Sequence, residues 1–418
     1  MPVERAITCG WFSGREKDAE IASAMNELRA LCRAAGAVVV GQSWQRRPLP
    51  DRRFLVGAGK AEELKRTVAG RGAGLVVFHN LLTTLQQRNL EDLLQVKVID
   101  RSRLILDIFA QRARSQEGKL QVELAQMLYL LPRLTGKGTA MSRLGGGIGT
   151  RGPGETKLET DRRLIKTRIA HIHKKLKSVS RNRDLQRRNR LLLPVPLVSL
   201  AGYTSAGKST LFKALTGEDV FISRELFATL DPLLRRVDMH DTHPGYYFIL
   251  SDTVGFIRDM PAELFTSFQA TLEEVRQADL LLHVIDLADP GWPAHKKEVE
   301  NVLRRLGIDA DRVIPVFNKI DLCGDREGLE LRAQAGEVFV SASEKAGLAA
   351  LKEEIFRRSF ADHAPFTVEV AEERQLETLG RWAIVLETSR VAGGWRAQVL
   401  CSRQKMLQFE EMHGGVTR

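Results

Sequence analysis

The stretch Leu197-Val-Ser-Leu-Ala-Gly-Tyr-Thr-Ser-Ala-Gly-Lys-Ser-Thr210 decides the fold of the central part of the chain. It passes from an apolar, strand-like segment into the pattern G-x-x-x-x-G-K-S at residues 202–209, and a helix-like segment follows from Leu211. This order predicts a P-loop, in which glycines allow backbone N–H groups to surround a phosphate chain. We expect Lys208 to reach the terminal phosphates and the Ser209 hydroxyl to hold Mg²⁺. The first helical turn should attract the same anion.

The run Asp252-Thr-Val-Gly-Phe256 follows a second apolar segment, residues 247–250. An aspartate at a strand end beside a P-loop can hold Mg²⁺ through water, and the Gly255 N–H can face a γ-phosphate. Ras-type domains carry here a glutamine that orients the attacking water, whereas Phe256 has no hydrogen-bonding group. We therefore expect slow intrinsic hydrolysis that a partner stimulates. Simple packing of Phe256 beneath this segment is the plainer interpretation, and both can hold.

The run Asn318-Lys-Ile-Asp321 follows the apolar segment 313–317, and Ser341-Ala-Ser343 follows the segment 338–340. The Asp321 carboxylate can accept the N1–H and the 2-amino hydrogens of guanine. Adenine lacks this pair of donors, so Asp321 selects guanine. Backbone N–H groups of the second run can meet guanine O6. Four motifs, each at a strand end and in this order, resemble the small GTP-binding (G) domain and predict a doubly wound α/β fold over residues 193–361.

A segment that the γ-phosphate orders is expected between the P-loop helix and the strand that leads to Asp252. The candidate is Phe227-Ala-Thr-Leu-Asp-Pro232, in which Thr229 would place its hydroxyl and carbonyl near Mg²⁺ and the γ-phosphate. Thr242 is the competitor. We favour Thr229, because Thr242 sits in the turn-like run Asp-Thr-His-Pro.

These motifs give a set of candidate site residues. The candidate nucleotide-binding residues are Gly202, Tyr203, Thr204, Ser205, Ala206, Gly207, Lys208, Ser209, Thr210, Asp252, Gly255, Asn318, Lys319, Asp321, Ser341 and Ala342. The candidate catalytic residues are Lys208, Thr229 and Gly255. The candidate Mg²⁺ ligands are Ser209, Thr229 and, through water, Asp252.

Composition favours a soluble protein of the cytoplasm, and partial association with the membrane stays open. No apolar run approaches the length of a membrane span, so we expect no stable membrane insertion. Charged residues interrupt the apolar core that a signal peptide needs, namely Glu4, Arg5, Arg15 and Glu16. The four cysteines contain no Cys-x-x-Cys pair, which argues against a zinc site or a disulfide framework and favours free thiols: Cys9, Cys32, Cys323 and Cys401.

The positive charge is concentrated in one segment. The chain has a net charge of +11, and residues 151–190 hold 14 Lys/Arg against 4 Asp/Glu, a net +10. In this segment apolar residues recur at helical spacing: Leu158, Ile165, Ile169, Ile172, Leu176 and Val179. The preceding segment offers an antiparallel partner that ends at Pro132: Leu120, Leu124, Met127, Leu128 and Leu131. We predict a helical hairpin over residues 116–192, with a closed apolar seam and a basic outer face.

The basic face of this hairpin has three interpretations. A solvated helix surface usually mixes signs, and this one does not, so a nucleic-acid backbone is favoured as its partner. A membrane surface is disfavoured, because the apolar stripe is narrow and has no aromatic residues. The candidate nucleic-acid contacts are Arg143, Arg151, Lys174, Lys175, Lys177, Arg187, Arg188 and Arg190.

Six of the eleven residues in Gly145-Gly-Gly-Ile-Gly-Thr-Arg-Gly-Pro-Gly-Glu155 are glycine, between the two predicted helices. So much glycine does not hold one regular structure in isolation. The run can be a disordered linker or a basic tip that orders on a crowded phosphate surface. A second phosphate loop is the weakest alternative, because no Gly-Lys-Ser/Thr is present.

The sequences on either side of these regions predict two smaller domains. In residues 1–115, short apolar strands at 37–40, 75–78 and 96–99 alternate with helical stretches, which predicts a small α/β domain with a parallel sheet. Gly57-Ala-Gly-Lys60 is not a second P-loop, because the first glycine of that motif would fall on Phe54. In residues 362–418, two strand-like runs flank Gly393-Gly394, which predicts a hairpin in a small α+β domain.

The order of these parts resembles the HflX family of GTPases over nearly the whole chain. The glycine-rich run and Phe256 carry the resemblance more specifically than the P-loop does. It implies a cytoplasmic, translation-associated GTPase that binds the large ribosomal subunit and its rRNA, not DNA. It also implies splitting or rescue of stalled ribosomes, especially under stress such as heat, with the glycine-rich tip near the peptidyl transferase centre. Off the ribosome we expect a monomer.

One residue departs from the pattern of related GTPases. Those with a hydrophobic residue after Asp-x-x-Gly often carry Asn where this chain has Ser205, and that Asn helps to hold a potassium ion that stimulates hydrolysis. The serine has a shorter reach, so dependence on a monovalent cation stays open. Three rival functions also stay open. They are a GTPase that acts in RNA modification, a GTP-dependent scaffold at the membrane, and an ATP-driven RNA remodeller, against which Asp321 argues.

Overall fold

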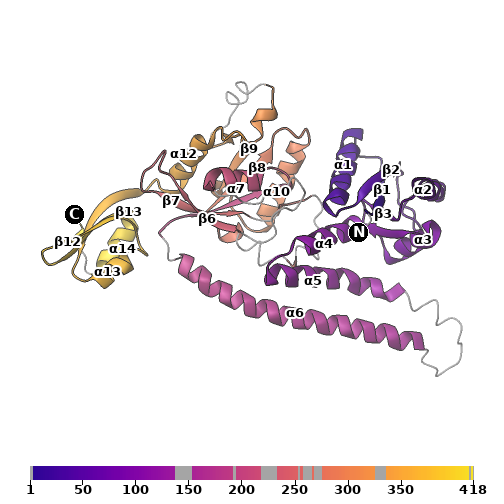
Figure 1. The fold of residues 1–418 in the computed structure, drawn as a ribbon, viewed down its shortest axis with the longest axis horizontal. Coiled ribbons are helices and arrows are strands. Elements are labelled where there is room, and N and C mark those ends of the chain that lie inside the picture. The colour runs from indigo at the N-terminus through magenta and orange to yellow at the C-terminus, as the bar shows by residue number, and fades with distance from the viewer. Residues whose placement is uncertain are drawn as a thin grey trace. The chain divides into compact units, whose positions relative to one another are not determined.

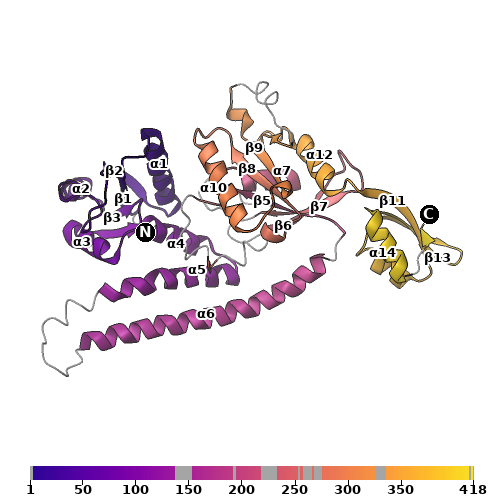
Figure 2. The ribbon, with the colours of Figure 1, turned by 180° about the vertical axis from the view of Figure 1, so that it is seen from behind.

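The computed structural model describes residues 3–136, 153–191, 194–217, 233–252, 255–257, 266–267, 275–324, 336–413 and 416–417. The chain divides into two compact units, of which residues 1–178 form the bulk of the first and most of the remainder forms the second. Figures 1 and 2 show three sheets along the chain, with a pair of helices, α5 and α6, after the first.

The first sheet is fully parallel, in the order β2-β1-β3-β4. Helices α2 and α3 cover the face that carries Ile7 and Val76, and α1 and α4 contact the sheet as well. The sequence predicted three of these strands and missed β1, where Thr8 and Gly10 interrupt the apolar run. The elements are β1 (Arg5–Phe12), α1 (Asp18–Ala34), β2 (Val38–Arg46), α2 (Ala58–Arg71), β3 (Leu75–Phe78), α3 (Thr84–Leu94), β4 (Lys97–Asp100) and α4 (Arg101–Arg112).

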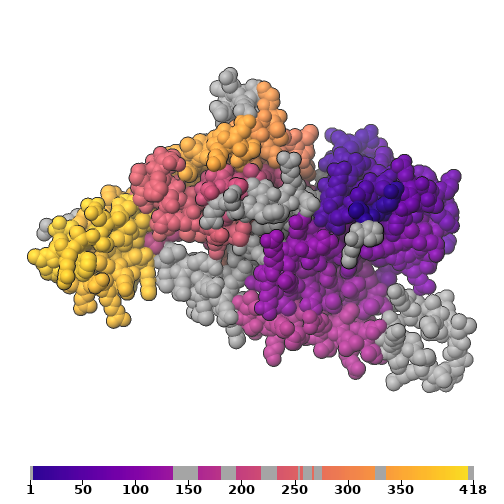
Figure 3. Space-filling model, in the orientation of Figure 1, coloured from indigo at the N-terminus to yellow at the C-terminus, as the bar shows by residue number. Residues whose placement is uncertain are grey.

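The helical hairpin follows as α5 (Gln116–Leu130), the short 3-10 helix η1 (Leu131–Gly136) and α6 (Pro153–Leu191). The two long helices lie side by side in both ribbon views, and their purple and magenta side chains abut in the space-filling view (Figure 3). Their seam contains Leu120, Leu124 and Ile172, with Met127, Leu128, Ile169 and Leu176 packed around them. Most of the predicted stripe is therefore confirmed. The last three residues of the glycine-rich run, 153–155, form the first turn of α6 rather than part of an irregular tip.

The second sheet is six-stranded, in the order β10-β9-β8-β5-β7-β6, and only β6 runs antiparallel to its neighbour. β5 lies at the centre, where the chain order reverses, which is the usual ligand position in such sheets. The elements are β5 (Leu197–Gly202), α7 (Lys208–Thr216), β6 (Leu233–Asp238), β7 (Tyr247–Asp252), β8 (Leu280–Asp286), α10 (Trp292–Arg305), η3 (Ala310–Arg312), β9 (Val313–Asn318), η4 (Ile320–Leu322), β10 (Val338–Phe339) and α12 (Leu348–Ser359).

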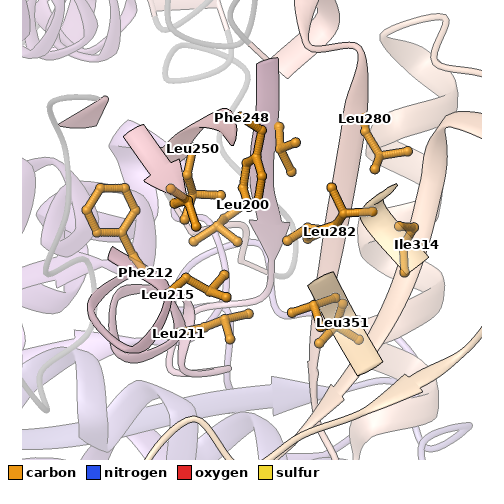
Figure 4. Close-up of a cluster of buried hydrophobic side chains, with 14 of the residues drawn as sticks. Leu200, Leu211, Phe212, Leu215, Phe248, Leu250, Leu280, Leu282, Ile314 and Leu351 are labelled. Carbon is orange, nitrogen blue, oxygen red and sulfur yellow. The ribbon is translucent and has the colours of Figure 1, made fainter. Parts of the chain in front are cut away.

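The core of this sheet positions the P-loop. Leu200 of β5 and Leu282 of β8 point to the face covered by α7 and α12, where they meet Leu211 and Leu351 (Figure 4). Alternate residues, such as His283, point to the opposite face, where α10 packs against β5 and β8. Helices on both faces confirm the predicted doubly wound fold.

A third, antiparallel sheet of order β12-β13-β11-β14 ends the chain. The hairpin predicted around Gly393-Gly394 is present, with Val391 paired to Gly394. The elements are β11 (His363–Val370), α13 (Glu373–Leu379), β12 (Ile384–Val391), β13 (Gly394–Ser402), α14 (Arg403–His413) and β14 (Val416–Thr417). Among the described residues, no helix combines the length and the apolar character that a membrane crossing requires.

Candidate nucleotide site

The P-loop lies between β5 and α7, at the carboxyl end of the central strand. Its backbone needs left-handed conformations at Gly202 (φ +154°), Ser205 (φ +63°) and Gly207 (φ +93°). A Cβ at Gly202 would lie 2.3 Å from the Val284 carbonyl oxygen, so this position also requires glycine for space. The first N–H groups of α7 have no acceptor within the helix and are therefore oriented to receive an anion.

Lys208 begins α7 and is buried within the loop that it serves. Its Nζ donates hydrogen bonds to the carbonyl oxygens of Gly202 (3.0 Å) and Tyr203 (2.8 Å). Burial lowers the pKa of Lys208 to about 8, and the charge of Asp252 acts in the opposite direction. The ammonium group is thus held at the centre of the loop in surroundings where a phosphate charge would stabilise it.

Ser209, in the first turn of α7, meets Asp252 at the end of β7. The Ser209 Oγ donates to Asp252 Oδ2 at 3.0 Å, and the Asp252 side chain is fully buried. A hydroxyl and a carboxylate are hard oxygen ligands, the kind that Mg²⁺ prefers, so this pair fits the metal that the sequence predicted here.

Gly255 and Phe256 pack directly on the P-loop. Phe256 forms a short parallel bridge with Tyr203, in which the Phe256 N–H donates to Gly202 O (3.0 Å) and the Thr204 N–H to Phe256 O (2.8 Å). A Cβ at Gly255 would lie 3.0 Å from Lys208 Nζ. The Phe256 side chain is buried, as the plainer interpretation of this residue expected.

Asn318 joins the phosphate-binding and base-binding loops. Its Nδ2 donates to the Ala206 carbonyl (2.9 Å), and its Oδ1 accepts from the Ala342 N–H (3.0 Å). Of the backbone N–H groups in the run 341–343 that were predicted to meet guanine O6, the one of Ala342 is bonded to Asn318 in this structure. A Cβ at Gly207 would lie 2.2 Å from Asn318 Nδ2, so the glycine leaves room for this amide.

The base-recognition residues are oriented by neighbours. The Ser341 hydroxyl donates to Asp321 Oδ1 at 2.7 Å, which fixes the carboxylate that is expected to select guanine. Lys319, in a left-handed conformation (φ +67°), forms an ion pair with Asp286 at the end of β8. The sequence analysis missed Asp286, although its position at a strand end was the same signal that identified Asp252.

Two further residues missed by the sequence analysis, His295 in α10 and Asp289 in the turn before that helix, support the P-loop. The His295 ring stacks on Tyr203 with ring centroids 4.0 Å apart, and His295 Nδ1 lies 3.3 Å from Asp289 Oδ2. Asp289 begins the run Asp-Pro-Gly, which is a turn signal, but nothing in the sequence alone pairs it with the P-loop.

Some predicted residues lie outside the described part of the chain. These are Thr229 with the rest of residues 227–232, and Arg143 and Arg151; the side chains of Arg187, Arg188 and Arg190 are also outside it. The competitor Thr242 is described, and its N–H and hydroxyl both donate to the Met239 carbonyl in the turn between β6 and β7. That turn precedes β7, at the opposite end of the strand from Asp252.

The basic face of α6 is exposed where it is described. Lys174, Lys175 and Lys177 are exposed, whereas Ile172 on the same helix is fully buried. Arg168 forms an ion pair with Glu123 of α5, so this arginine also ties the hairpin together.

Comparison with known proteins agrees with this arrangement. Three family models match successive regions: GTP-binding GTPase N-terminal (residues 22–110), GTP-binding GTPase Middle Region (112–190) and 50S ribosome-binding GTPase (197–319). The protein named GTPase HflX from Caldanaerobacter subterraneus subsp. tengcongensis is 49% identical over 86% of this chain and 81% of its own. The chain belongs to the HflX family of GTPases.

A second HflX protein, from Escherichia coli strain K12, is 44% identical over 87% of this chain and 85% of its own. A solved structure described as SsGBP in complex with GDP is 23% identical, covers 85% of this chain and 98% of that one, and has a TM-score of 0.47. The HflX relationship makes the chain a GTP-binding protein that hydrolyses GTP.

Proposed function

We propose that this HflX GTPase binds the large ribosomal subunit and acts as a GTP-gated factor that splits or rescues ribosomes. The predominantly basic surface of α6 carries the proposal. Residues 159–179 hold seven Lys/Arg against two Asp/Glu, and Lys174, Lys175 and Lys177 are exposed. Such a surface favours a phosphate backbone as its partner. The match to a model described as a 50S ribosome-binding GTPase supports the large subunit as the source of that backbone.

The segment that follows β7 would change conformation with the bound nucleotide and transmit this change to the rest of the protein. The strand ends at Asp252, and Gly255 and Phe256 beyond it contact the P-loop backbone. A γ-phosphate would hold the Gly255 N–H and Thr229, and hydrolysis would release both segments. We expect the GTP form to bind the ribosome and the GDP form to dissociate from it.

Mg²⁺ is part of this proposal because the donor set fits it. The Ser209 hydroxyl and Thr229 would hold the ion directly, and Asp252 would hold it through water. When bound, Mg²⁺ neutralises charge on the β- and γ-phosphates. Lys208 would bind the same phosphates, and Asp321, held by Ser341, would bind the base.

Phe256 supports dependence on a partner for hydrolysis. Its side chain is buried and has no group that could orient water, so another residue must position the attacking water when the ribosome docks. We expect slow turnover by the isolated protein and faster turnover on the large subunit.

The test is co-sedimentation of the protein with isolated large subunits in GTP or GDP, at several salt concentrations. The variant Lys174→Glu/Lys175→Glu/Lys177→Glu reverses three exposed charges on α6. The matched control, Lys297→Glu/Arg304→Glu/Arg305→Glu, reverses three exposed charges on α10. We expect GTP-dependent binding that weakens by orders of magnitude between about 50 and 200 mM salt. The α6 variant should lose most of this binding and the control should keep it.

The affinity of each variant for GTP in the absence of ribosomes distinguishes the outcomes of this experiment. Loss of ribosome binding with unchanged GTP affinity in the α6 variant supports the proposal, whereas equal loss of both indicates misfolding of the variant. Equal ribosome binding by wild type and the α6 variant would contradict the role of the basic face. Binding to tRNA or to vesicles, with none to the subunit, would favour the rival RNA-modification or membrane functions.

A further inference from the structure

The first turns of α10 contact the P-loop through one aromatic pair. The rings of His295 and Tyr203 are nearly parallel, with an interplanar angle of 9° and centroids 4.0 Å apart. Tyr203 is buried and the His295 side chain is 14% exposed, so the pair is largely shielded from water. Tyr203 is therefore a P-loop residue whose side chain is held from outside the loop.

The His295 ring is itself fixed by a carboxylate. Its Nδ1 lies 3.3 Å from Asp289 Oδ2, while the other carboxylate oxygen accepts the Gly291 N–H at 2.8 Å. The Asp289 backbone is fixed as well, because its carbonyl accepts the Trp292 N–H at 2.9 Å as α10 begins. These contacts orient the imidazole against the tyrosine ring.

The backbone of Tyr203 is where this support would act on the nucleotide. Its carbonyl oxygen accepts the Lys208 ammonium at 2.8 Å and lies 3.3 Å from the Ala206 N–H. A shift of Tyr203 would therefore move both the ammonium group and the turn that surrounds the phosphates.

We propose that His295 and Asp289 are positioning residues that hold the P-loop in its phosphate-binding conformation through Tyr203. Their effect falls on the phosphate end of the nucleotide. The base end has its own support from the same helix, because Trp292 contacts Phe317 edge to face (centroids 5.5 Å apart) just before Asn318. One helix start thus supports the two ends of the site through separate contacts.

The test compares affinities for GDP and GMP, measured by competition against a fluorescent GDP. GMP lacks the β-phosphate that the P-loop surrounds, so it reports the base end more than the phosphate end. We expect His295→Ala to weaken GDP binding about three- to tenfold, the range of a buried aromatic stack, and GMP binding by less than about twofold. His295→Phe keeps a flat ring and should restore most of the GDP affinity.

Two further variants separate positioning from general stability. Asp289→Asn should weaken GDP binding less than His295→Ala does, because the stack remains while its orientation loosens. Trp292→Ala should weaken GDP and GMP equally, because it disturbs the base end. Equal losses for GDP and GMP in His295→Ala, or no loss in GDP affinity, would overturn the proposal. If His295→Ala does not fold, failure of Asp289→Asn to change the GDP-to-GMP ratio from that of Trp292→Ala would overturn it equally.

Discussion

Two sheets in this chain, one parallel and one mainly parallel, both have polar side chains at the carboxyl ends of strands, but these side chains have different roles. In the first sheet Asn80 bonds to both the N–H and the carbonyl of Trp11, and Asp100 accepts from four donors on Leu82, Arg103, Tyr129 and Arg133. These side chains hold the surrounding chain. In the second sheet Asp252 meets the Ser209 hydroxyl. Strand-end position therefore does not by itself mark a ligand site.

The same contrast holds for two nearly identical tetrapeptides, Gly57-Ala-Gly-Lys60 and Ser205-Ala-Gly-Lys208. In the first, the Ala-Gly-Lys part is ordinary helix, and Lys60 forms an ion pair with Glu63 at 2.7 Å. In the second, Gly207 has φ +93° and Lys208 is buried among backbone carbonyls. Backbone conformation and burial, rather than residue identity, distinguish the lysine that we propose as a phosphate ligand.

The two lysines give the largest expected difference. Lys208→Ala should lower GTP affinity and turnover by at least about a hundredfold, because it removes a charge-assisted contact to the phosphates. Lys60→Ala should change neither by more than about twofold, since its ion pair is near the surface. Binding of a fluorescent GTP analogue measures both variants. A comparable loss of GTP affinity in Lys60→Ala would contradict the distinction between the two lysines.

The two buried aspartates should separate activity from stability. Asp252→Asn should raise the Mg²⁺ concentration needed for half-maximal turnover by about 10- to 100-fold, as loss of an outer ligand does. The free energy of unfolding should change little. Asp100→Asn should lower the free energy of unfolding by about 2–3 kcal/mol, because Arg133 loses its carboxylate partner. Mg²⁺ titration of turnover and urea unfolding test the pair; a similar effect of both variants on either measurement would contradict the assignment.

The two glycines test the role of backbone conformation. Gly207→Ala should weaken GDP binding by about 30-fold, because its Cβ would overlap the Asn318 amide and its φ is strained for alanine. Gly59 is helical with open space around its Cβ position, so Gly59→Ala should stabilise the fold by up to about 1 kcal/mol. Calorimetry and thermal unfolding measure both. Unchanged GDP affinity in Gly207→Ala would show that the loop tolerates a different backbone.

The buried lysine also predicts a pH dependence. Because the pKa of Lys208 is lowered to about 8, GDP affinity should fall about tenfold between pH 7 and 9 as the ammonium deprotonates. Between about pH 8 and the ordinary lysine value of 10.5, the unfolded chain binds more protons at this site, so this residue makes stability rise with pH. Lys208→Ala is the control, because any effect of guanine ionisation on GDP affinity remains in this variant while the titration of the lysine is removed. The same pH profile in both proteins would contradict the burial argument.

Much of the fold and most of the site could be predicted from the sequence. The motif order located β5, β7 and β9 because each motif requires a strand before it, and the 3.6-residue pattern located α5 and α6. β1 was missed because its apolar run is interrupted, although it lies inside the first sheet. Local pattern alone does not reveal a strand that long-range pairing stabilises.

The site residues that sequence could not supply are those whose role depends on three-dimensional contact. His295 is 92 residues from Tyr203, and no spacing rule connects them. Asp286 holds Lys319 from a neighbouring strand for the same reason. By contrast, the prediction that Phe256 cannot orient the attacking water needs only its place in the motif, because the lack of a hydrogen-bonding group is a property of the residue.

The most direct test of the proposed ribosome-gated GTPase is GTP turnover by the purified protein, alone and with isolated large ribosomal subunits, at fixed salt. We predict slow turnover by the protein alone and strong stimulation by the subunit, since Phe256 leaves the attacking water to be positioned by a partner. Equal, slow turnover in both conditions would contradict this function and leave a GTPase with another partner.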